Sequence, residues 1–239
     1  MRETVAETGS TSADLLARLV AGEDLPEGFW LIADRQVDGR GRQGRRWLDA
    51  PGNFMGSTVV RLQAGDQPAA SLSFVTALAV YAAVSGRLAA PAQLSLKWPN
   101  DVLLSGVKFC GILLEREGEH AVIGVGVNLA AAPRLAERRT LSLAERGVAA
   151  DRDLFADDLA GRMTRELALW RRKGVGPMFT RWQTAAHPLG TRLTVHDGQG
   201  QPTAGAYDGL APDGALRLLL DDGTRRMIHA GDVSQQGAG

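Results

Sequence analysis

The residues best suited to chemistry lie in one short stretch, Gln36–Trp47. Four arginines are interspersed there with three glycines: Arg40, Arg42, Arg45 and Arg46 with Gly39, Gly41 and Gly44. Like charges this close repel one another, and glycine loses much conformational freedom on folding. The stretch, here called the arginine loop, is therefore predicted to bind an anionic ligand. We also expect it to be mobile until an anion neutralises it.

The glycines of the arginine loop also match the spacing G-x-G-x-x-G of dinucleotide-binding proteins. That fingerprint requires a helix to begin at the glycines, so that the helix N-terminus faces a pyrophosphate. Here Pro51-Gly52 follows, and then a strand-like pattern, Asn53–Leu62. The context therefore argues against a Rossmann turn, and the absence of Gly-Lys-Ser/Thr excludes a P-loop.

A second polar group is expected on two neighbouring strands, Leu94–Leu104 and Val107–Arg116. The first carries Lys97-Trp-Pro-Asn-Asp101 and the second carries Lys108-Phe-Cys-Gly-Ile112. The short connection between them predicts an antiparallel hairpin that brings both segments together. Two lysines and several arginines that face an aspartate suit a ligand with several negative charges and a divalent cation, as ATP chemistry requires.

Each of these features also has a simpler explanation. Trp98-Pro-Asn-Asp could be a strand irregularity, because proline interrupts a ladder and asparagine and aspartate favour turns. Lys108 could be a solvated lysine at a sheet edge. The constellation as a whole, rather than any single residue, favours a ligand site.

Ser10 and Thr11 are predicted to lie at the N-terminus of a helix. Thr11-Ser-Ala-Asp14 has the spacing of a capping box with aspartate in place of glutamate, and Gly22 is the expected stop. Free backbone N–H groups and hydroxyls at such an end can bind polar ligand groups. Simple helix capping is the alternative, and the pattern leaves both open.

The remaining elements predict an α+β fold, a mixed, largely antiparallel sheet with flanking helices. The expected order is strand Phe29–Ala33, arginine loop, strand Asn53–Leu62, helix Gln67–Leu88, strands Leu94–Leu104, Val107–Arg116 and His120–Leu129, and helices Asp151–Lys173 and Gly176–Ala186. Short connections make the three consecutive strands antiparallel hairpins. The poorly patterned connection Ala130–Ala150 is long enough to be mobile or ordered by a ligand.

A composition shift at His187-Pro-Leu-Gly190 indicates a domain boundary. After it the chain has short strand patterns separated by Asp197-Gly198, Asp213-Gly214 and Asp222-Gly223. Asp-Gly pairs favour hairpin turns, so this part is predicted to be a small β-barrel of about five strands. The predicted domains are residues 1–187 and 188–239.

The composition gives no sign of bulk attraction to nucleic acid. Lysine plus arginine and aspartate plus glutamate both number 27. The single cysteine, Cys110, excludes an intrachain disulfide and a thiol metal cluster, which fits a reducing cytoplasm. Gln67–Gly86 has no charge over twenty residues, but alanines and hydroxyl residues dilute it, which favours a buried helix over a membrane span. The N-terminus lacks a signal-peptide core.

In their order along the chain, the motifs resemble those of the biotin protein ligases. They are Ser10-Thr11, Gln36-x-x-Gly-Arg-Gly-Arg-Gln-Gly-Arg-Arg-Trp47, Lys97-Trp-Pro-Asn-Asp101, Lys108-Phe-Cys-Gly-Ile-Leu113 and Gly124-Val-Gly-Val-Asn128. The resemblance covers nearly the whole chain. It implies a catalytic domain like that of the class II synthetases and biotin ligases, followed by an SH3-like β-barrel. Because Ser10-Thr11 comes so early, it implies the class without an N-terminal DNA-binding domain.

The resemblance also implies an enzyme that activates biotin with ATP and Mg²⁺ as biotinyl-5′-AMP and releases pyrophosphate. Such an enzyme then transfers the biotinyl group to one lysine of a biotin carboxyl carrier protein, as in acetyl-CoA carboxylase. A carboxylate does not acylate an amine at neutral pH, and forming the mixed anhydride brings two anions together. Cationic residues and Mg²⁺ must therefore supply most of the stabilisation, and no covalent enzyme intermediate is needed.

Matching positions imply the roles of single residues. Biotin-binding residues would be Ser10, Thr11, Ser12, Gln36, Gly39, Arg40, Gly41, Arg42, Lys108 and Gly111. ATP and adenylate contacts would be Arg40, Arg42, Arg45, Trp47, Lys97, Asn100, Lys108 and Asn128. Gly111, Gly126 and Asn128 would line the pocket where close approach of the backbone is needed. The catalytic residues would be Arg42, Lys108 and Asp101, and Asp101 is also the candidate Mg²⁺ ligand. Ser12 departs from the asparagine often found at this place in the family.

Two other functions fit parts of the same pattern. A lipoate ligase has a related fold, but the combination of Lys-Trp-Pro-Asn-Asp with Gly-Arg-Gly-Arg argues against it. A nucleic-acid-binding module could use Arg40–Arg46 as a phosphate patch, but zero net charge and a single short cluster argue against it. No membrane partner is expected. An exposed sheet edge would permit a homodimer.

Overall fold

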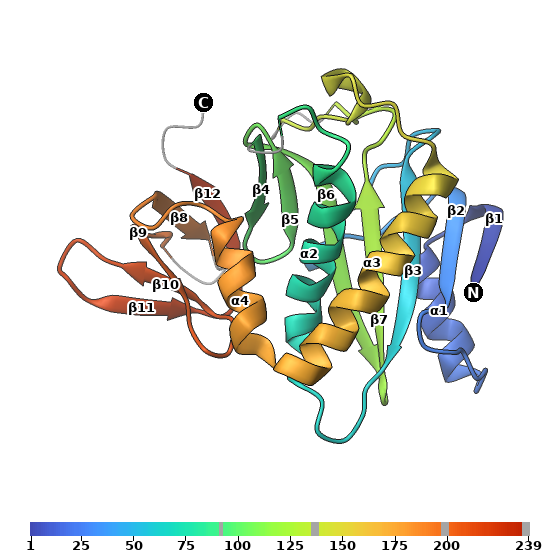
Figure 1. Ribbon diagram of the computed structural model, residues 1–239, viewed down its shortest axis with the longest axis horizontal. Helices are drawn as coiled ribbons and strands as arrows, with labels where there is room; N and C mark the ends of the chain where they lie inside the picture. The colour runs from blue at the N-terminus through green and yellow to red at the C-terminus, as the bar shows by residue number, and fades with distance from the viewer. Residues whose placement is uncertain (91–92, 135–138, 197–200, 236–239) are drawn as a thin grey trace.

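The computed structural model describes residues 1–90, 93–134, 139–196 and 201–235. Its larger sheet has seven strands: β1 (Arg2–Thr8), β2 (Trp30–Gln36), β3 (Phe54–Arg61), β4 (Leu94–Lys97), β5 (Asp101–Leu104), β6 (Val107–Glu117) and β7 (His120–Val127). Their order across the sheet is β1-β2-β3-β7-β6-β5-β4 (Figure 1). β1 and β2 are parallel and all other neighbours are antiparallel. The expected mixed, largely antiparallel sheet is confirmed.

β1 is an addition to the expected sheet. It lies at the edge, pairs only with β2 among the strands of residues 1–90, 93–134, 139–196 and 201–235, and exposes most of its side chains. Val5 is the only large apolar residue among its seven, so the strand has no buried stripe that a sequence pattern could reveal. Backbone hydrogen bonds to β2 are therefore what defines this strand.

The expected strand Leu94–Leu104 is wrong in one respect, because it breaks into β4 and β5. Lys97 pairs with Asp101 across the resulting hairpin, and Trp98-Pro-Asn100 forms the turn, with a cis Trp98–Pro99 peptide bond. Proline cannot donate a ladder hydrogen bond, and asparagine favours turns, which explains the reversal. The segment that carries the polar residues is therefore a tight turn rather than a strand.

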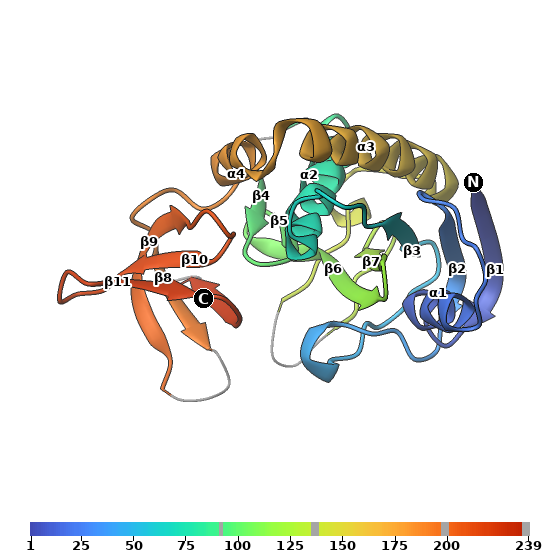
Figure 2. The same ribbon diagram turned by 90° about the horizontal axis from the view of Figure 1, so that it is seen from below.

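Helices cover both faces of this sheet. α2 (Leu72–Ser85) and α3 (Arg152–Lys173) lie on one face, and α1 (Thr11–Val20) lies on the other (Figure 2). Ten of the 14 residues of α2 are buried, which accounts for its apolar composition on all sides. The expected buried helix is thus confirmed, although it begins at Leu72 because Ala69–Ser71 forms a 3₁₀ turn. None of the helices that the structure describes is long and apolar enough to cross a bilayer.

α1 differs from its expected start by one residue. Ser10 rather than Thr11 is the N-cap, and its Oγ accepts the backbone N–H of Ala13 at 3.4 Å. The carboxylate of Asp14 accepts a hydrogen bond from the Thr8 hydroxyl and does not cap the helix. The Thr11 hydroxyl is therefore not needed for capping and can serve another purpose.

The C-terminal part forms a five-stranded antiparallel sheet: β8 (Arg192–His196), β9 (Thr203–Leu210), β10 (Leu216–Leu219), β11 (Arg225–Ile228) and β12 (Asp232–Gln235). Their order is β11-β10-β9-β8-β12, and the expected five strands are confirmed. Asp213-Gly214 and Asp222-Gly223 lie in turns, as expected, whereas Asp197-Gly198 lies outside the described residues.

The two sheets share one hydrophobic core. Phe74 of α2 and Phe179 of α4 (Val175–Thr184) meet edge to face, with ring centroids 5.0 Å apart. The indole Nε1 of Trp98, in the β4–β5 turn, donates to the Gly214 carbonyl at 3.0 Å. These contacts hold the smaller sheet against the β4 side of the larger one, so that β12 lies near the polar turn (Figure 1).

Candidate functional site

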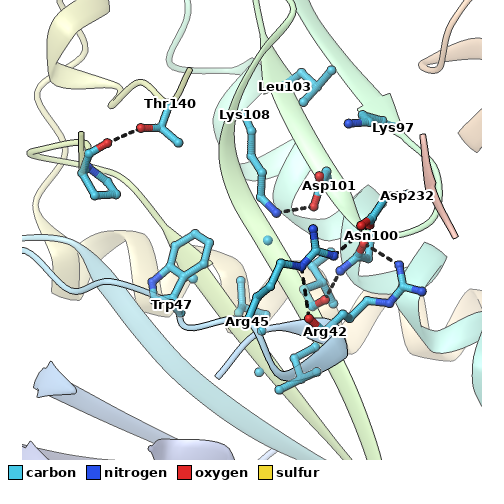
Figure 3. Close-up of a pocket in the computed structure, with 18 of the residues that line it drawn as sticks. Arg42, Arg45, Trp47, Lys97, Asn100, Asp101, Leu103, Lys108, Thr140 and Asp232 are labelled. Atoms are coloured by element: carbon cyan, nitrogen blue, oxygen red, sulfur yellow. Dashed lines mark hydrogen bonds and ion pairs between the residues drawn. The ribbon is translucent and has the colours of Figure 1, made fainter. Parts of the chain in front are cut away.

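A cavity of about 1540 Å³ opens on the face of the larger sheet where α1 lies. Its walls come from the start of α1, the arginine loop, the β4–β5 turn with β6, and β12 (Figure 3). Pockets for one small molecule usually measure roughly 300–1,000 Å³. The cavity therefore has room for more than one small substrate.

Most of the residues predicted from the sequence line this cavity. They are Ser10, Thr11, Ser12, Gln36, Arg40, Gly41, Arg42, Arg45, Trp47, Lys97, Asn100, Asp101, Lys108 and Gly111, together with Gly126. The three candidate catalytic residues, Arg42, Asp101 and Lys108, are among them. Segments separated by many residues in the sequence thus meet in one place.

Gly39 and Asn128 lie outside the lining. Gly39 stabilises the fold of the arginine loop, since its carbonyl accepts the Trp47 backbone N–H at 2.8 Å. Asn128 is buried, and its Nδ2 donates to the Leu141 carbonyl at 3.1 Å. Its Oδ1 is buried without a partner in the described part of the chain. Asn128 therefore anchors part of the connection Ala130–Ala150, where Leu141 is buried as well.

Lys108 and Asp101 form an ion pair inside the cavity. Lys108 Nζ lies 2.5 Å from Asp101 Oδ1, and the two side chains are only 19% and 15% exposed. Asp101 pairs with Lys97 across the β4–β5 hairpin, so the turn brings both lysines to the same carboxylate region. The expected meeting of the turn with the start of β6 is confirmed (Figure 3).

Arg42 reaches from the arginine loop to the β4–β5 turn. Its Nη1 donates to Asn100 Oδ1 at 3.2 Å. Burial lowers the pKa of Arg42, while the nearby carboxylates of Asp232 and Asp101 favour its charged form. A guanidinium remains protonated at any ordinary pH, so the cavity holds a half-buried cation that a bound anion would stabilise.

Arg45 connects the arginine loop to the C-terminal sheet. Its Nη2 lies 2.8 Å from Asp232 Oδ1, and the two side chains are 41% and 43% exposed. Asp232 begins β12 and lines the cavity, yet no sequence motif marks it. Arg46 also lines the cavity, but its side chain is 64% exposed and donates to the Val37 carbonyl at 2.8 Å.

The arginine loop folds back on itself rather than leading into a helix. Gly41 N–H donates to the Arg45 carbonyl at 2.7 Å, and only a three-residue 3₁₀ turn, Arg42–Gly44, lies between them. Gln43 adopts a left-handed backbone conformation there, with φ of 58°. The structure therefore agrees with the exclusion of a Rossmann turn, because no α-helix starts at the glycines.

Trp47 lies on the floor of the cavity. A Cβ built on Gly126 would be 2.3 Å from the indole, and one on Gly111 would be 3.0 Å from it. Lys108 Nζ lies 5.9 Å from the ring centroid, and the indole Nε1 is buried without a partner among the described residues. A side chain at position 126 or 111 would crowd the tryptophan ring, which explains why both residues are glycine.

Hydroxyl groups line another wall of the cavity. The Thr11 N–H and hydroxyl lie 2.8 and 3.0 Å from Gln36 Oε1. Ser57 of β3, which the sequence analysis did not identify, lies 2.7 Å from Thr11 Oγ1 and 2.9 Å from Ser12 Oγ. In the sequence, Ser57 differed from its neighbours only as a hydroxyl residue within a mostly apolar strand pattern, a feature that Thr58 shares.

The carboxylates of the cavity do not form a metal cluster by themselves. No group of three His, Cys, Asp or Glu side chains in the described residues could hold an ion. Asp101 is paired with Lys108, Asp232 is paired with Arg45, and the Glu145 carboxylate accepts hydrogen bonds from Ser142. Mg²⁺ commonly takes one or two carboxylates beside substrate phosphates, so Asp101 fits it only as a single ligand.

His187 is another cavity residue that carries no sequence motif. It lies at the junction of the two parts of the chain and lines the cavity. Burial lowers the pKa of His187, and the charge of Lys97 lowers it further. The imidazole is therefore neutral at physiological pH.

Two family patterns match the sequence. The pattern described as the Biotin/lipoate A/B protein ligase family matches residues 8–128. The pattern described as the Biotin protein ligase C terminal domain matches residues 189–234. The first contains most of the cavity lining, and the second contains the five-stranded sheet.

Several known proteins are similar to this chain over nearly its full length. It is 38% identical to the biotin–acetyl-CoA-carboxylase ligase of Paracoccus denitrificans, over 96% of this chain and 98% of that protein. It is also 38% identical to the ligase of the same name from Mycobacterium tuberculosis, over 97% of this chain and 87% of that protein. A structure of the biotin protein ligase from Aquifex aeolicus in complex with biotin and ATP is 27% identical, has a TM-score of 0.85, and is matched over 98% of both chains.

Proposed function

Because this chain belongs to the biotin protein ligase family, we propose that the cavity described above is where it joins biotin to ATP. The protein is an ATP-dependent ligase that forms biotinyl-5′-AMP and transfers the biotinyl group to a lysine of a biotin carrier domain. Its catalytic part has the biotin ligase fold, and its C-terminal sheet is the SH3-like domain of the family.

The observation that carries the proposal is the division of the cavity into a cationic part and a hydroxyl part. Arg42 and Lys108 lie at the β4–β5 turn, and Thr11, Ser12 and Ser57 lie beside the start of α1. Biotin has a polar, uncharged head group and a carboxylate at the end of its chain. The head group suits the hydroxyls, and the carboxylate and the α-phosphate of ATP suit the cations.

In the first step an oxygen of the biotin carboxylate forms a bond to the α-phosphorus of ATP. The bond from that phosphorus to the oxygen that bridges it to the β-phosphate breaks, and pyrophosphate leaves. Lys108 and Arg42 reduce the repulsion between the two anions and stabilise the charge on the α-phosphate. In the second step the amine of the acceptor lysine attacks the acyl carbon, loses a proton, and displaces AMP.

The ion pair between Lys108 and Asp101 has a role in this scheme. An arriving carboxylate or phosphate would compete with Asp101 for Lys108, and the released carboxylate of Asp101 would be the protein group that holds Mg²⁺, whose charge would stabilise the phosphates. With one carboxylate, the site would complete the Mg²⁺ shell with phosphate oxygens and water. Asp101 is thus assigned as a single Mg²⁺ ligand rather than as a general base.

The remaining predicted residues receive more general roles. Arg40 and Arg45 order the arginine loop over the nucleotide, and Trp47 forms a wall for the adenylate. Lys97 and Asn100 lie on the phosphate side. Ser10, Gln36, Gly41 and Gly111 contact biotin or shape its pocket, and Gly39 shapes the loop. Asn128, expected from the family resemblance to contact ATP, would support the nucleotide site by anchoring the 141–143 segment.

The domain division and the setting of the reaction are also proposals. Residues 1–187 would form the catalytic domain and residues 188–239 the C-terminal domain, which is consistent with the family pattern at 189–234. The acceptor would be the biotin carboxyl carrier protein of acetyl-CoA carboxylase, in the cytoplasm, with no nucleic-acid or membrane partner. A homodimer through the exposed edge strand β1 is compatible with this scheme.

Transfer of labelled biotin to a purified biotin carrier domain, with ATP and Mg²⁺, tests the proposed function. We expect label on the carrier, and pyrophosphate release that depends on biotin. The same assay with lipoate in place of biotin tests for the related activity, that of a lipoate ligase. Pyrophosphate release and carrier labelling with lipoate but not with biotin would refute the proposal.

A further inference from the structure

The hydroxyl wall of the cavity forms a continuous hydrogen-bonded chain. Ser57 Oγ lies 2.7 Å from Thr11 Oγ1 and 2.9 Å from Ser12 Oγ, and Thr11 Oγ1 lies 3.0 Å from Gln36 Oε1. All four side chains line the cavity, and Ser57 is its most deeply buried member, with no exposed surface. These residues, Ser12, Ser57, Thr11 and Gln36, are called the hydroxyl chain.

The direction of each hydrogen bond in the hydroxyl chain follows from counting donors. Gln36 Oε1 accepts the Thr11 backbone N–H at 2.8 Å, and an N–H group can only donate. The Thr11 hydroxyl must direct its single hydrogen at the same oxygen, because two oxygens without a hydrogen between them would repel. Ser57 must then donate to Thr11 Oγ1, and Ser12 must donate to Ser57 Oγ.

This order leaves the three hydroxyl groups as acceptors only for a ligand. Each of the three hydroxyl hydrogens is used within the chain, so the hydroxyl oxygens offer lone pairs alone. Ser12 Oγ accepts no hydrogen bond from any group in the described residues, and donation to Ser57 makes it a better acceptor. We infer that Ser57 is a positioning residue that sets this order, so that Ser12 accepts a hydrogen bond from an N–H of the cyclic urea of biotin.

The inference rests on the proposed function, because it takes biotin as the ligand, and it adds a reason for choosing biotin over lipoate. The urea of biotin has two N–H donors and one carbonyl acceptor, whereas the dithiolane head of lipoate has no N–H. Lipoate would leave the Ser12 acceptor buried without a partner, which costs binding energy. Gln36 Nε2 donates to no protein group in the described part of the chain and is available to the urea carbonyl.

Gly124 of β7 keeps the Ser12 hydroxyl in place. A Cβ built on Gly124 would lie 2.5 Å from Ser12 Oγ and 3.5 Å from Ser57 Oγ. The first distance is too short for any real contact, so a side chain at this position would turn Ser12 away from Ser57. Gly124→Ala should therefore break the hydroxyl chain at the same link as Ser57→Ala.

The test compares ligands that differ by one hydrogen-bond donor. The probes are biotin and its two cyclic carbamate analogues, in each of which a ring oxygen replaces one urea N–H without changing the shape. Binding is measured by calorimetry without ATP, on the full-length protein. We expect the wild-type protein to bind one of the analogues at least about tenfold more weakly than biotin, as one lost hydrogen bond predicts.

Ser57→Ala should reduce this discrimination to less than about threefold, because the freed Ser12 hydroxyl can turn and donate to the ring oxygen. Biotin itself should bind about tenfold more weakly, while kcat for adenylate formation at saturating biotin changes little. Ser57→Cys, which keeps a weak donor, should recover part of the discrimination. Thr58→Ala is the matched control, because Thr58 donates to the Phe29 carbonyl and does not line the cavity.

Two results would overturn the inference. One is equal loss of affinity for biotin and for both analogues in Ser57→Ala, which would indicate a merely structural role. The other is unchanged biotin affinity together with unchanged discrimination in a folded Ser57→Ala protein. Failure of the proposed function would look different, because the wild-type protein would then neither bind biotin nor release pyrophosphate.

Discussion

The indole of Trp47 lies directly against the backbone of Gly126. A Cβ on residue 126 would be 2.3 Å from the indole Cε2, so no side chain fits between them. The glycine of β7 therefore sets where the tryptophan of the arginine loop rests when the loop lies over the cavity. The structure thus explains the glycine at position 126 by the protein's own Trp47 side chain, whereas the family resemblance implied close approach to a ligand.

Gly126→Ala should move Trp47 and weaken adenylate formation by about tenfold or more. Because Trp47 is on a loop, the loop can shift, and the free energy of unfolding should change by less than the roughly 1–3 kcal/mol of a rigid overpacked core. Biotinyl-AMP formation and thermal unfolding measure the two effects. In a Trp47→Ala background the same glycine change should have little further effect, and equal losses in both backgrounds would contradict the contact. Gly161→Ala, with nothing near its Cβ, is the control.

Lys108→Ala and Arg42→Ala should each reduce adenylate formation by about 10²–10³-fold, because each removes a cation that stabilises the α-phosphate. Biotin-dependent pyrophosphate release is the measurement. Arg116→Ala is the matched control, since Arg116 is exposed, donates to the Gly118 carbonyl and does not line the cavity. Near-normal pyrophosphate release in both cavity variants would refute these roles.

Asp101→Asn should raise the Mg²⁺ concentration needed for adenylate formation, because one anionic oxygen ligand is lost. Transfer from preformed biotinyl-AMP to a carrier domain should stay near the wild-type rate. The Mg²⁺ dependence of pyrophosphate release and a single-turnover transfer assay distinguish the two steps. A transfer defect with unchanged Mg²⁺ dependence would instead show that Asp101 acts on the acceptor lysine.

Asp232→Asn should loosen the arginine loop, because Arg45 loses its charged partner on β12. Exposed ion pairs contribute only about 0–1 kcal/mol, so the effect should be a several-fold faster amide exchange at Gly39–Arg46 rather than loss of the fold. Biotin and ATP together should restore protection in both proteins. Asp221→Asn, which breaks an exposed pair with Arg192 elsewhere in the C-terminal sheet, is the control. Equal exchange with and without ligand in the wild-type protein would rule out a ligand-ordered loop.

His187 should make the protein less stable as the pH falls below about 6.5. Burial lowers the pKa of His187 in the folded state from its ordinary value of 6.5, with a further contribution from Lys97. Above the ordinary value the group is neutral in both states, and stability is fully present. As the pH falls, the unfolded chain binds the proton first, so the free energy of unfolding decreases until the folded pKa is reached. His187→Asn should flatten this part of the pH–Tm curve.

Much of the site could be predicted because its chemistry is concentrated in short segments. The arginine loop, the Lys97–Asp101 segment and Lys108 each have a composition that a plain connection would not need, and the structure brings all three to one cavity. The helices 72–85 and 152–173 could be predicted from their apolar residues. These features depend on local composition, which the linear chain displays directly.

Other features required the folded chain. Ser57 meets Ser12 across 45 residues, and Arg45 meets Asp232 across 187 residues. No local pattern links such partners, because sheet pairing and the packing of the two sheets bring them together. The edge strand β1 belongs to the same group, because its pairing with β2 defines it. The linear chain therefore identified the groups that handle charge, and tertiary packing determined which hydroxyl, carboxylate and glycine hold those groups in position.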